Sequence, residues 1–251
     1  MSKIALVTGG SRGLGKNMAL SLAKNGLDVV ITYHSKKDAA DEVVKEIQAL
    51  GQKAATLQLA VDQSEGYDDF VKALGDLLEA DFGVATFDYL VNNAGSALYQ
   101  SFKDTTEAQF DSMVNIHLKS AYFLTQKLLG LLNNGGGIVN ISSGLARFSN
   151  PGCSAYGAVK AAVETLTRYQ ALELGSLGIR SNVIAPGPIE TDFGGGNIRD
   201  NAAVNKAIAS QTALGRVGLP GDIGGVVSFL CSDAAQWVNG QRIEISGGIH
   251  L

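Results

Sequence analysis

The chain has 251 residues, of which 45% are hydrophobic, and a formal net charge of −4 from 20 basic and 24 acidic side chains. No basic stripe is present, which argues against a nucleic-acid partner, and the apolar runs are far shorter than the roughly 20 residues of a membrane span. The two cysteines supply neither a disulfide framework nor metal-ligand spacing, so we expect no metal site.

Short apolar runs alternate with longer amphipathic stretches along the chain. We expect strands over residues 4–7, 29–32, 54–61, 87–91, 137–141, 179–184 and 242–245. Helices are expected between them, notably over residues 16–25, 38–50, 107–132 and 155–174. This alternation predicts a three-layer α/β fold, a Rossmann-type doubly wound parallel sheet of about seven strands with helices on both faces. Residues 1–251 then form a single dinucleotide-binding domain. Since a strand begins at Ile4, no room is left for a signal peptide, and we expect a cytoplasmic protein.

A glycine-rich turn, Thr8-Gly9-Gly10-Ser11-Arg12-Gly13-Leu14-Gly15, follows the first expected strand and opens the first expected helix. In that setting, backbone N–H groups and a helix N-terminus approach the pyrophosphate of a dinucleotide. The residues that we assign to this contact are Gly9, Ser11, Arg12, Gly13, Leu14 and Gly15. A plain strand-to-helix turn is the alternative interpretation.

The end of the second strand indicates which dinucleotide binds. An NAD enzyme usually carries an acid there for the ribose 2′-hydroxyl, but this strand runs into Tyr33-His34-Ser35-Lys36, and Asp38 comes only inside the next helix. A carboxylate would repel a 2′-phosphate, whereas Arg12 and the residues after Tyr33 can receive one. We therefore expect NADP(H), bound in part by Tyr33, His34, Ser35 and Lys36. The alternative is that these are solvated charges and that both cofactors are accepted.

Tyr156 stands four residues before Lys160, a spacing that brings two side chains together on one helix face. Such pairs are common, but Ser143 lies thirteen residues before this tyrosine, and Asn92-Asn93-Ala94-Gly95 follows an apolar run. Together with the TGxxxGxG spacing of the glycine turn, these features resemble the short-chain dehydrogenase/reductase family. The resemblance covers nearly the whole chain.

The resemblance implies a reacting centre built on Tyr156. A tyrosine ordinarily has a pKa of about 10, and the ammonium of Lys160 would lower it. Tyr156 would be the general acid in carbonyl reduction and the general base in alcohol oxidation, while Ser143 would hold the substrate oxygen. Asn115 would anchor a water molecule of the proton relay behind Lys160. The alternatives are a Ser143 that only caps the strand end and an Asn115 that only bonds backbone.

The resemblance also implies the rest of the cofactor groove. Asp62 would touch the adenine, Asn92, Ala94 and Gly95 would line the nucleotide groove, and Pro186, Gly187, Ile189 and Thr191 would lie at the nicotinamide end. The lone histidines His117 and His250 have no partner spacing, and we assign them no chemistry.

Residues 188–211 are expected to form a substrate lid, because a mobile-looking triple glycine is followed there by a helical pattern. The expected pocket wall is mainly apolar: Ser96, Ala97, Leu145, Phe148 and Phe193. This favours an NADP(H)-dependent reductase of free ketones or aldehydes. A 3-oxoacyl-[acyl-carrier-protein] reductase is the alternative, although residues 129–134 and 176–178 lack the bases that would dock an acidic carrier. A non-catalytic dinucleotide-binding protein is the alternative of another class.

The two longest expected helices, 107–132 and 155–174, carry apolar residues on more than one face, including Leu124, Leu128, Leu131, Val163, Leu166 and Ala171. A helix that is apolar all round needs a partner besides its own sheet. Members of the family pair these helices across a two-fold axis, so we expect a homotetramer.

Overall fold

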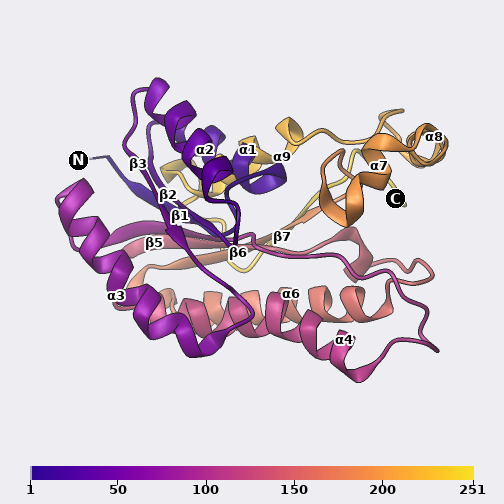
Figure 1. Cartoon of the computed structure of the whole chain (residues 1–251), viewed down its shortest axis with the longest axis horizontal. Helices are drawn as coiled ribbons and strands as arrows, with labels where there is room; N and C mark the ends of the chain where they lie inside the picture. Colours follow the sequence, from indigo (N-terminus) through magenta and orange to yellow (C-terminus); the bar gives the residue numbers. More distant parts are fainter. Residues whose placement is uncertain (1) are drawn as a thin grey trace.

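The computed structural model describes residues 2–251 and contains one β-sheet of seven strands (Figure 1). The strands are β1 (Ile4–Val7), β2 (Asp28–Tyr33), β3 (Ala54–Gln58), β4 (Phe87–Asn92), β5 (Leu132–Ile141), β6 (Arg180–Pro186) and β7 (Arg242–Ile245). They lie in the order β3-β2-β1-β4-β5-β6-β7, and every neighbouring pair is parallel. The predicted Rossmann-type fold is confirmed.

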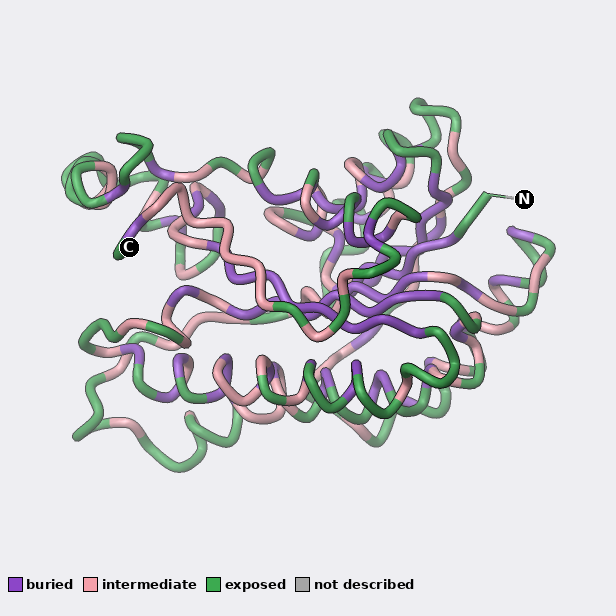
Figure 2. The backbone as a smooth tube through the Cα atoms, turned by 180° about the vertical axis from the view of Figure 1, so that it is seen from behind, coloured by how far each residue is buried: buried purple, intermediate pink, exposed green. Residues whose placement is uncertain are grey.

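Helices cover both faces of this sheet. On one face lie α1 (Gly13–Lys24), α2 (Lys37–Ala49) and α9 (Gly221–Leu230), and on the other lie α3 (Tyr67–Leu77), α4 (Glu107–Met113), α5 (Thr125–Leu128) and α6 (Ser154–Glu173) (Figure 1). Each face has its own cluster of buried apolar side chains, one containing Val7 and Leu22 and the other Leu6 and Leu74. Because side chains alternate across a strand, Leu6 and Val7 belong to opposite cores. The inner strands are mostly buried, whereas the edge strands β3 and β7 are mostly half-buried (Figure 2).

Short helical turns connect these elements. They are η1 (Ser64–Gly66), η2 (Leu78–Phe82), η4 (Gly144–Ala146), η5 (Gly175–Leu177), η6 (Phe193–Gly196) and η7 (Asp233–Ala235). Within residues 2–251, no helix combines the length and the apolar character that crossing a membrane requires.

The predicted helix 107–132 differs from the structure at its end. Its first piece, α4, begins at a capping box formed by Thr106 and Gln109. The helix continues through wider π-type turns, η3 (Val114–Leu124), into α5, and Leu132 is already the first residue of β5. The prediction ran too far because a short apolar run is compatible with either a helix or a strand. For the same reason the third strand ends at Gln58 and does not continue through residue 61.

The order of the sheet reverses between β1 and β4, so the chain leaves the carboxyl ends of these neighbouring strands in opposite directions. Such a point leaves a crevice in which ligands of this fold bind. The segment formed by η6, α7 (Asn197–Asp200) and α8 (Ala202–Gln211) lies at the same end of the molecule as the C-terminus (Figure 1). The fold thus places the glycine turn and the C-terminal third of the chain around one opening.

Candidate active site

A cleft of about 1080 Å³ opens at the carboxyl ends of the strands. Its wall contains most of the expected site residues: Gly9, Ser11, Arg12, Gly13, Leu14, Gly15, His34, Ser35, Lys36, Asp62, Ala94, Gly95, Ser96, Ala97, Ser143, Leu145, Phe148, Tyr156, Lys160, Pro186, Gly187, Ile189, Thr191 and Phe193. Three expected residues, Tyr33, Asn92 and Asn115, are not part of this wall. The cleft has a nucleotide end, formed by the glycine turn and the end of β2, and a substrate end, formed around Tyr156.

The glycine turn forms the nucleotide end through its backbone. Gly9 and Gly13 have positive φ angles of 66° and 54°, a region that side chains with a Cβ rarely adopt. A Cβ on Gly15 would lie 2.2 Å from the carbonyl oxygen of Gly9, so no other residue fits there without moving the turn. The first turn of α1 carries no acidic residue. Its free N–H groups can therefore receive a phosphate.

Asn93 anchors this turn to the neighbouring strand. Its side-chain nitrogen donates hydrogen bonds to the carbonyl oxygens of Thr8 at 2.8 Å and Gly9 at 3.2 Å. Asn92, the residue expected in the groove, instead turns behind β4, where it donates to Thr125 at 3.0 Å and to Asn140 at 2.9 Å. The expectation for Asn92 is corrected, because adjacent residues at a strand end point to opposite sides.

The end of β2 shapes the wall beyond the glycine turn. Thr32 and His34 line the cleft, and the Thr32 hydroxyl accepts a hydrogen bond of 3.1 Å from the Gly9 N–H. Tyr33 lies between them and packs against the core on the other side, so its expected contact is also corrected. Asp38 belongs to the first turn of α2 and does not line the cleft. No acid therefore ends β2.

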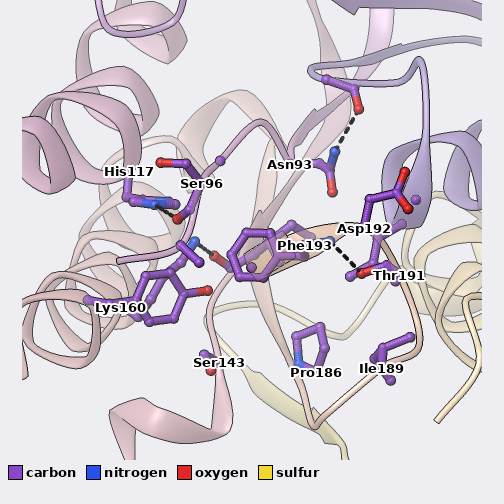
Figure 3. A pocket seen from close by; sticks show the side chains of 18 of the residues that line it. Asn93, Ser96, His117, Ser143, Lys160, Pro186, Ile189, Thr191, Asp192 and Phe193 are labelled. Atoms are coloured by element: carbon purple, nitrogen blue, oxygen red, sulfur yellow. Dashed lines mark hydrogen bonds between the residues drawn. The ribbon is translucent and has the colours of Figure 1, made fainter. Parts of the chain in front are cut away.

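The reacting groups meet at the substrate end. Tyr156 and Lys160 lie in the first two turns of α6, and Nζ of Lys160 is 5.5 Å from the centre of the Tyr156 ring. This Nζ is buried and donates a 2.7 Å hydrogen bond to the carbonyl oxygen of Ile141 (Figure 3). Ser143, just after β5, lines the same cleft and also accepts a 3.2 Å hydrogen bond from Leu145 N–H. The serine is thus both a cap and a wall residue.

Burial sets the protonation of this pair in the protein alone. It raises the pKa of the Tyr156 phenol above its ordinary value, while the Ser143 hydroxyl acts in the opposite direction. It also lowers the pKa of Lys160 to about 7. In the protein alone, loss of solvent outweighs the hydrogen bond of Ser143, so the lower pKa expected for Tyr156 would have to arise in the cofactor complex. A raised pKa keeps Tyr156 protonated at neutral pH, which suits a proton donor.

The structure separates Asn115 from this centre and brings His117 to it. Asn115 borders neither the cleft nor the small cavity behind it, whereas His117 borders both. The His117 ring meets the Tyr156 ring edge-on at 5.3 Å, and its Nε2 is 2.8 Å from the carbonyl oxygen of Ser96 (Figure 3). The available sequence signal was a histidine two residues after Asn115 on the same expected helix.

Aromatic side chains enclose the substrate end. The centre of the Phe193 ring lies 6.1 Å from that of Tyr156, and the Phe148 ring lies 4.3 Å from the His250 ring, tilted by 55°. Tyr99 borders the cleft beside Gly194. Sequence reasoning missed Tyr99 and His250, because nothing in the chain order shows that the C-terminus returns to the cleft. Among residues 2–251 no cluster of side chains could hold a metal ion.

The chain is similar in sequence to known oxidoreductases over nearly its whole length. A sequence family described as "Enoyl-(Acyl carrier protein) reductase" matches residues 9–250. The short-chain dehydrogenase/reductase FrzI of Cladobotryum sp is 37% identical over 99% of this chain and 96% of its own length. The 3-oxoacyl-[acyl-carrier-protein] reductase FabG of Staphylococcus aureus is 37% identical over 100% of this chain and 99% of its own.

A solved structure agrees with these relatives. The angucycline C-6 ketoreductase LanV with bound NADP superimposes with a TM-score of 0.93 and 34% identity, covering 98% of this chain and 95% of its own. The similarity extends over the glycine turn, the sheet and the Tyr156 helix alike. The chain belongs to the short-chain dehydrogenase/reductase family.

Proposed function

We propose that this chain is an NADP(H)-dependent oxidoreductase that reduces a ketone or aldehyde to an alcohol, reversibly, in the cleft. The observation that carries the proposal is the convergence of Tyr156, Lys160 and Ser143 at one end of a cleft whose other end is a glycine-built cradle. The sequence prediction of family and reaction class agrees with the relatives, among them a ketoreductase solved with NADP.

The residues of this chain supply binding, orientation and a proton. The Ser143 hydroxyl donates a hydrogen bond to the substrate carbonyl oxygen and holds it near the phenol of Tyr156, which gives its proton to that oxygen as the alcohol forms. Lys160 uses one N–H for Ile141 and keeps the others for a ribose hydroxyl and for the proton relay. The cofactor, when bound, supplies the hydride.

The nucleotide end fits NADP(H). Gly15 allows no Cβ, which leaves the backbone free to approach a pyrophosphate. Arg12, Ser35 and Lys36 line the cleft near His34, where a 2′-phosphate would lie. The absence of an acid at the end of β2 removes the group that would favour NAD. The retained Tyr156 and Lys160 argue against a protein that only binds the dinucleotide.

The substrate end favours a free ketone with aromatic or other apolar rings. Phe148, Phe193 and Tyr99 offer flat apolar faces beside Tyr156, and ring stacking at such faces stabilises aromatic ligands. The ketoreductase LanV, named for an angucycline ketone, has the same fold. Residues 188–211 supply Phe193, Ile198, Val204 and Ile208 to this wall. We propose that they close over the substrate, with Gly194, Gly195 and Gly196 at positive φ as the flexible joint.

Reduction of 3-oxoacyl groups on acyl carrier protein remains a second candidate, because FabG is as similar in sequence as FrzI. One assay separates the two candidates: NADPH oxidation with a fused-ring aromatic ketone, a simple aldehyde and a 3-oxoacyl thioester. We expect kcat/KM for the ring ketone to exceed that for the thioester by at least about tenfold, a difference of about 1.4 kcal/mol in transition-state binding. The reverse order would favour the carrier-protein reductase, and no oxidation of NADPH with any carbonyl would refute the proposed function.

We further propose a homotetramer. Of the apolar residues named above on the two long helices, Leu124, Leu128, Val163 and Ala171 are buried within the chain itself. The same helices expose other apolar side chains: Tyr122, Phe123, Tyr169 and Leu172, the last 77% exposed. Exposed apolar patches of this kind mark association surfaces. Light scattering at micromolar concentration should give four chains, and Leu172→Asp should reduce that number, whereas a monomeric parent would contradict the proposal.

A cytoplasmic location is also proposed. Cys153 and Cys231 are free thiols, as expected in a reducing compartment. Fractionation of the producing cells would test this, since recovery in a secreted fraction would contradict it.

A further inference from the structure

A second, much smaller cavity lies directly behind the reacting centre. It measures about 10 Å³, close to the volume that one water molecule requires. Thr8, Asn92, His117, Ser120 and Lys160 contribute its polar lining. A water molecule in such a place needs two to four polar partners, so the hydrogen-bonding capacity of these side chains decides whether one belongs there.

One ring nitrogen of His117 has no hydrogen-bond partner among the described residues. The ring is only 4% exposed, and Nε2 must be the protonated nitrogen, since the carbonyl oxygen of Ser96 can only accept. Nδ1 is then an acceptor, and it is buried without a hydrogen-bond partner among the described protein groups. Burial, assisted by the charge of Lys160, lowers the pKa of His117 to about 2, so the ring is neutral at any working pH. Leaving such an acceptor unpaired is costly.

Lys160 and Asn92 each have hydrogen-bonding groups available for a water molecule in this cavity. The ammonium of Lys160 has three N–H donors, of which one is used by the Ile141 carbonyl, and the side chain is 5% exposed. The amide nitrogen of Asn92 is committed to Thr125 and Asn140, which leaves its Oδ1 as an acceptor. A water molecule in the cavity could accept from Lys160 and donate to His117 and Asn92, which is the usual number of contacts for a buried water.

We propose that His117 is a positioning residue of the proton relay: its Nδ1 accepts a hydrogen bond from a water molecule in this cavity, and that water accepts one from Nζ of Lys160. The inference rests on the proposed function for its kinetic consequence only. Nδ1 polarises the water, the water stabilises the ammonium, and the ammonium favours the phenolate of Tyr156. The edge-on contact of the ring with Tyr156 fixes the geometry of this chain of contacts.

Two substitutions test the roles of the two ring nitrogens of His117 independently. In His117→Gln the longer amide can still donate to Ser96 but offers no acceptor at the place of Nδ1. In His117→Asn the shorter amide offers that acceptor but cannot reach Ser96. Tyr99 and Cys153, the other titratable groups that act on Tyr156, are unchanged in both.

We expect His117→Gln to lower kcat about tenfold and to move the midpoint of the pH profile for alcohol oxidation upward by about half to one pH unit, the effect of one lost hydrogen bond. His117→Asn should keep the parent profile and raise KM for NADPH, because the Ser96 loop borders the cofactor groove. A Gln variant with the parent profile, or equal shifts in both variants, would overturn the proposal.

A measurement on the unaltered holoenzyme does not depend on turnover or on the folding of any variant. Nitrogen-15 NMR of the NADP⁺ complex should show His117 as a neutral ring with Nε2 protonated and Nδ1 accepting a hydrogen bond. A free Nδ1, or the opposite tautomer, would overturn the inference even in an active enzyme. The same spectrum showing an accepted hydrogen bond would support it even if no ketone were turned over, a result that would refute only the proposed function.

Discussion

The two ends of the cleft are built from different parts of the chain. At the nucleotide end the backbone itself forms the wall, and contacts are so close that Gly15 has no room for a Cβ. At the substrate end side chains form the wall, and they come from distant segments: Tyr99 after β4, Phe193 after β6 and His250 at the C-terminus. We therefore expect the first end to tolerate few substitutions, whereas the second can change its substrate by exchanging side chains.

The largest effect is expected at the junction of the two ends. Tyr156→Phe removes the proton that the carbonyl oxygen must receive, so kcat for ketone reduction should fall by about a thousandfold. NADPH affinity should stay within a few-fold, because the ring itself and its contacts with His117 and Phe193 are kept. Stopped-flow NADPH oxidation and cofactor fluorescence titration measure the two quantities. Turnover within tenfold of the parent would remove Tyr156 from the mechanism.

The next effect tests the rigidity of the nucleotide end. In Gly15→Ala the new Cβ would lie 2.2 Å from the Gly9 oxygen and 2.5 Å from the Asn93 side-chain nitrogen, so the turn must shift. We expect NADPH affinity to fall by at least about a hundredfold and stability to fall by about 1–3 kcal/mol. Gly75→Ala in α3 is the matched control, because no atom lies within 4 Å of its Cβ and alanine favours a helix. Unchanged NADPH affinity in Gly15→Ala would contradict the claim that the glycine turn binds the cofactor.

A smaller effect is expected where the cofactor is selected. His34→Asp places a carboxylate at the end of β2, close to Arg12, Ser35 and Lys36. It should lower kcat/KM for NADPH and raise it for NADH, each by about tenfold, through repulsion of the 2′-phosphate and attraction of the 2′-hydroxyl. His34→Asn, which adds no charge, should shift the ratio much less. Equal kcat/KM for the two cofactors in the parent enzyme would show that the region does not discriminate.

A last prediction concerns acid stability and not activity. The unfolded chain protonates His117 below pH 6.5, but the folded protein does so only near a pKa of about 2, so the unfolded state binds more protons in between. Stability should therefore fall as the pH is lowered from 6.5 to 4.5, by about 2–3 kcal/mol from this residue. Denaturant titrations of the parent and of His117→Phe measure the difference, and the variant should lose this part of the slope. If the free energy of unfolding of the parent and of His117→Phe changed in parallel with pH, the ring would not be buried as a neutral group.

The sequence predicted the nucleotide end far better than the substrate end. Backbone cradles leave a local signature, since Gly9, Gly13 and Gly15 are adjacent in the chain and each is required by the geometry of the turn. Even there, the sequence did not show which of two adjacent strand-end residues faces the cleft. Asn93 contacts the glycine turn in place of Asn92, and Tyr33 packs against the core.

The substrate end has no local signature. His117 and His250 are single residues whose meaning comes from what packs against them, the Tyr156 ring in one case and the Phe148 ring in the other. The two long helices illustrate a related limit: a periodic pattern shows that a helix is apolar on several sides but not which side meets its own sheet. Tertiary packing decides both questions.

The central claim is that a hydride from NADPH reaches a carbonyl carbon in this cleft while Tyr156 protonates the oxygen. The most direct measurement uses NADPH carrying deuterium at the transferable position, with a fused-ring ketone that also contains a conjugated carbon–carbon double bond. We predict one deuterium on the carbinol carbon of the alcohol for each NADPH consumed, with the double bond intact. Deuterium on the carbon–carbon double bond with the ketone unchanged, or no consumption of NADPH, would contradict the account.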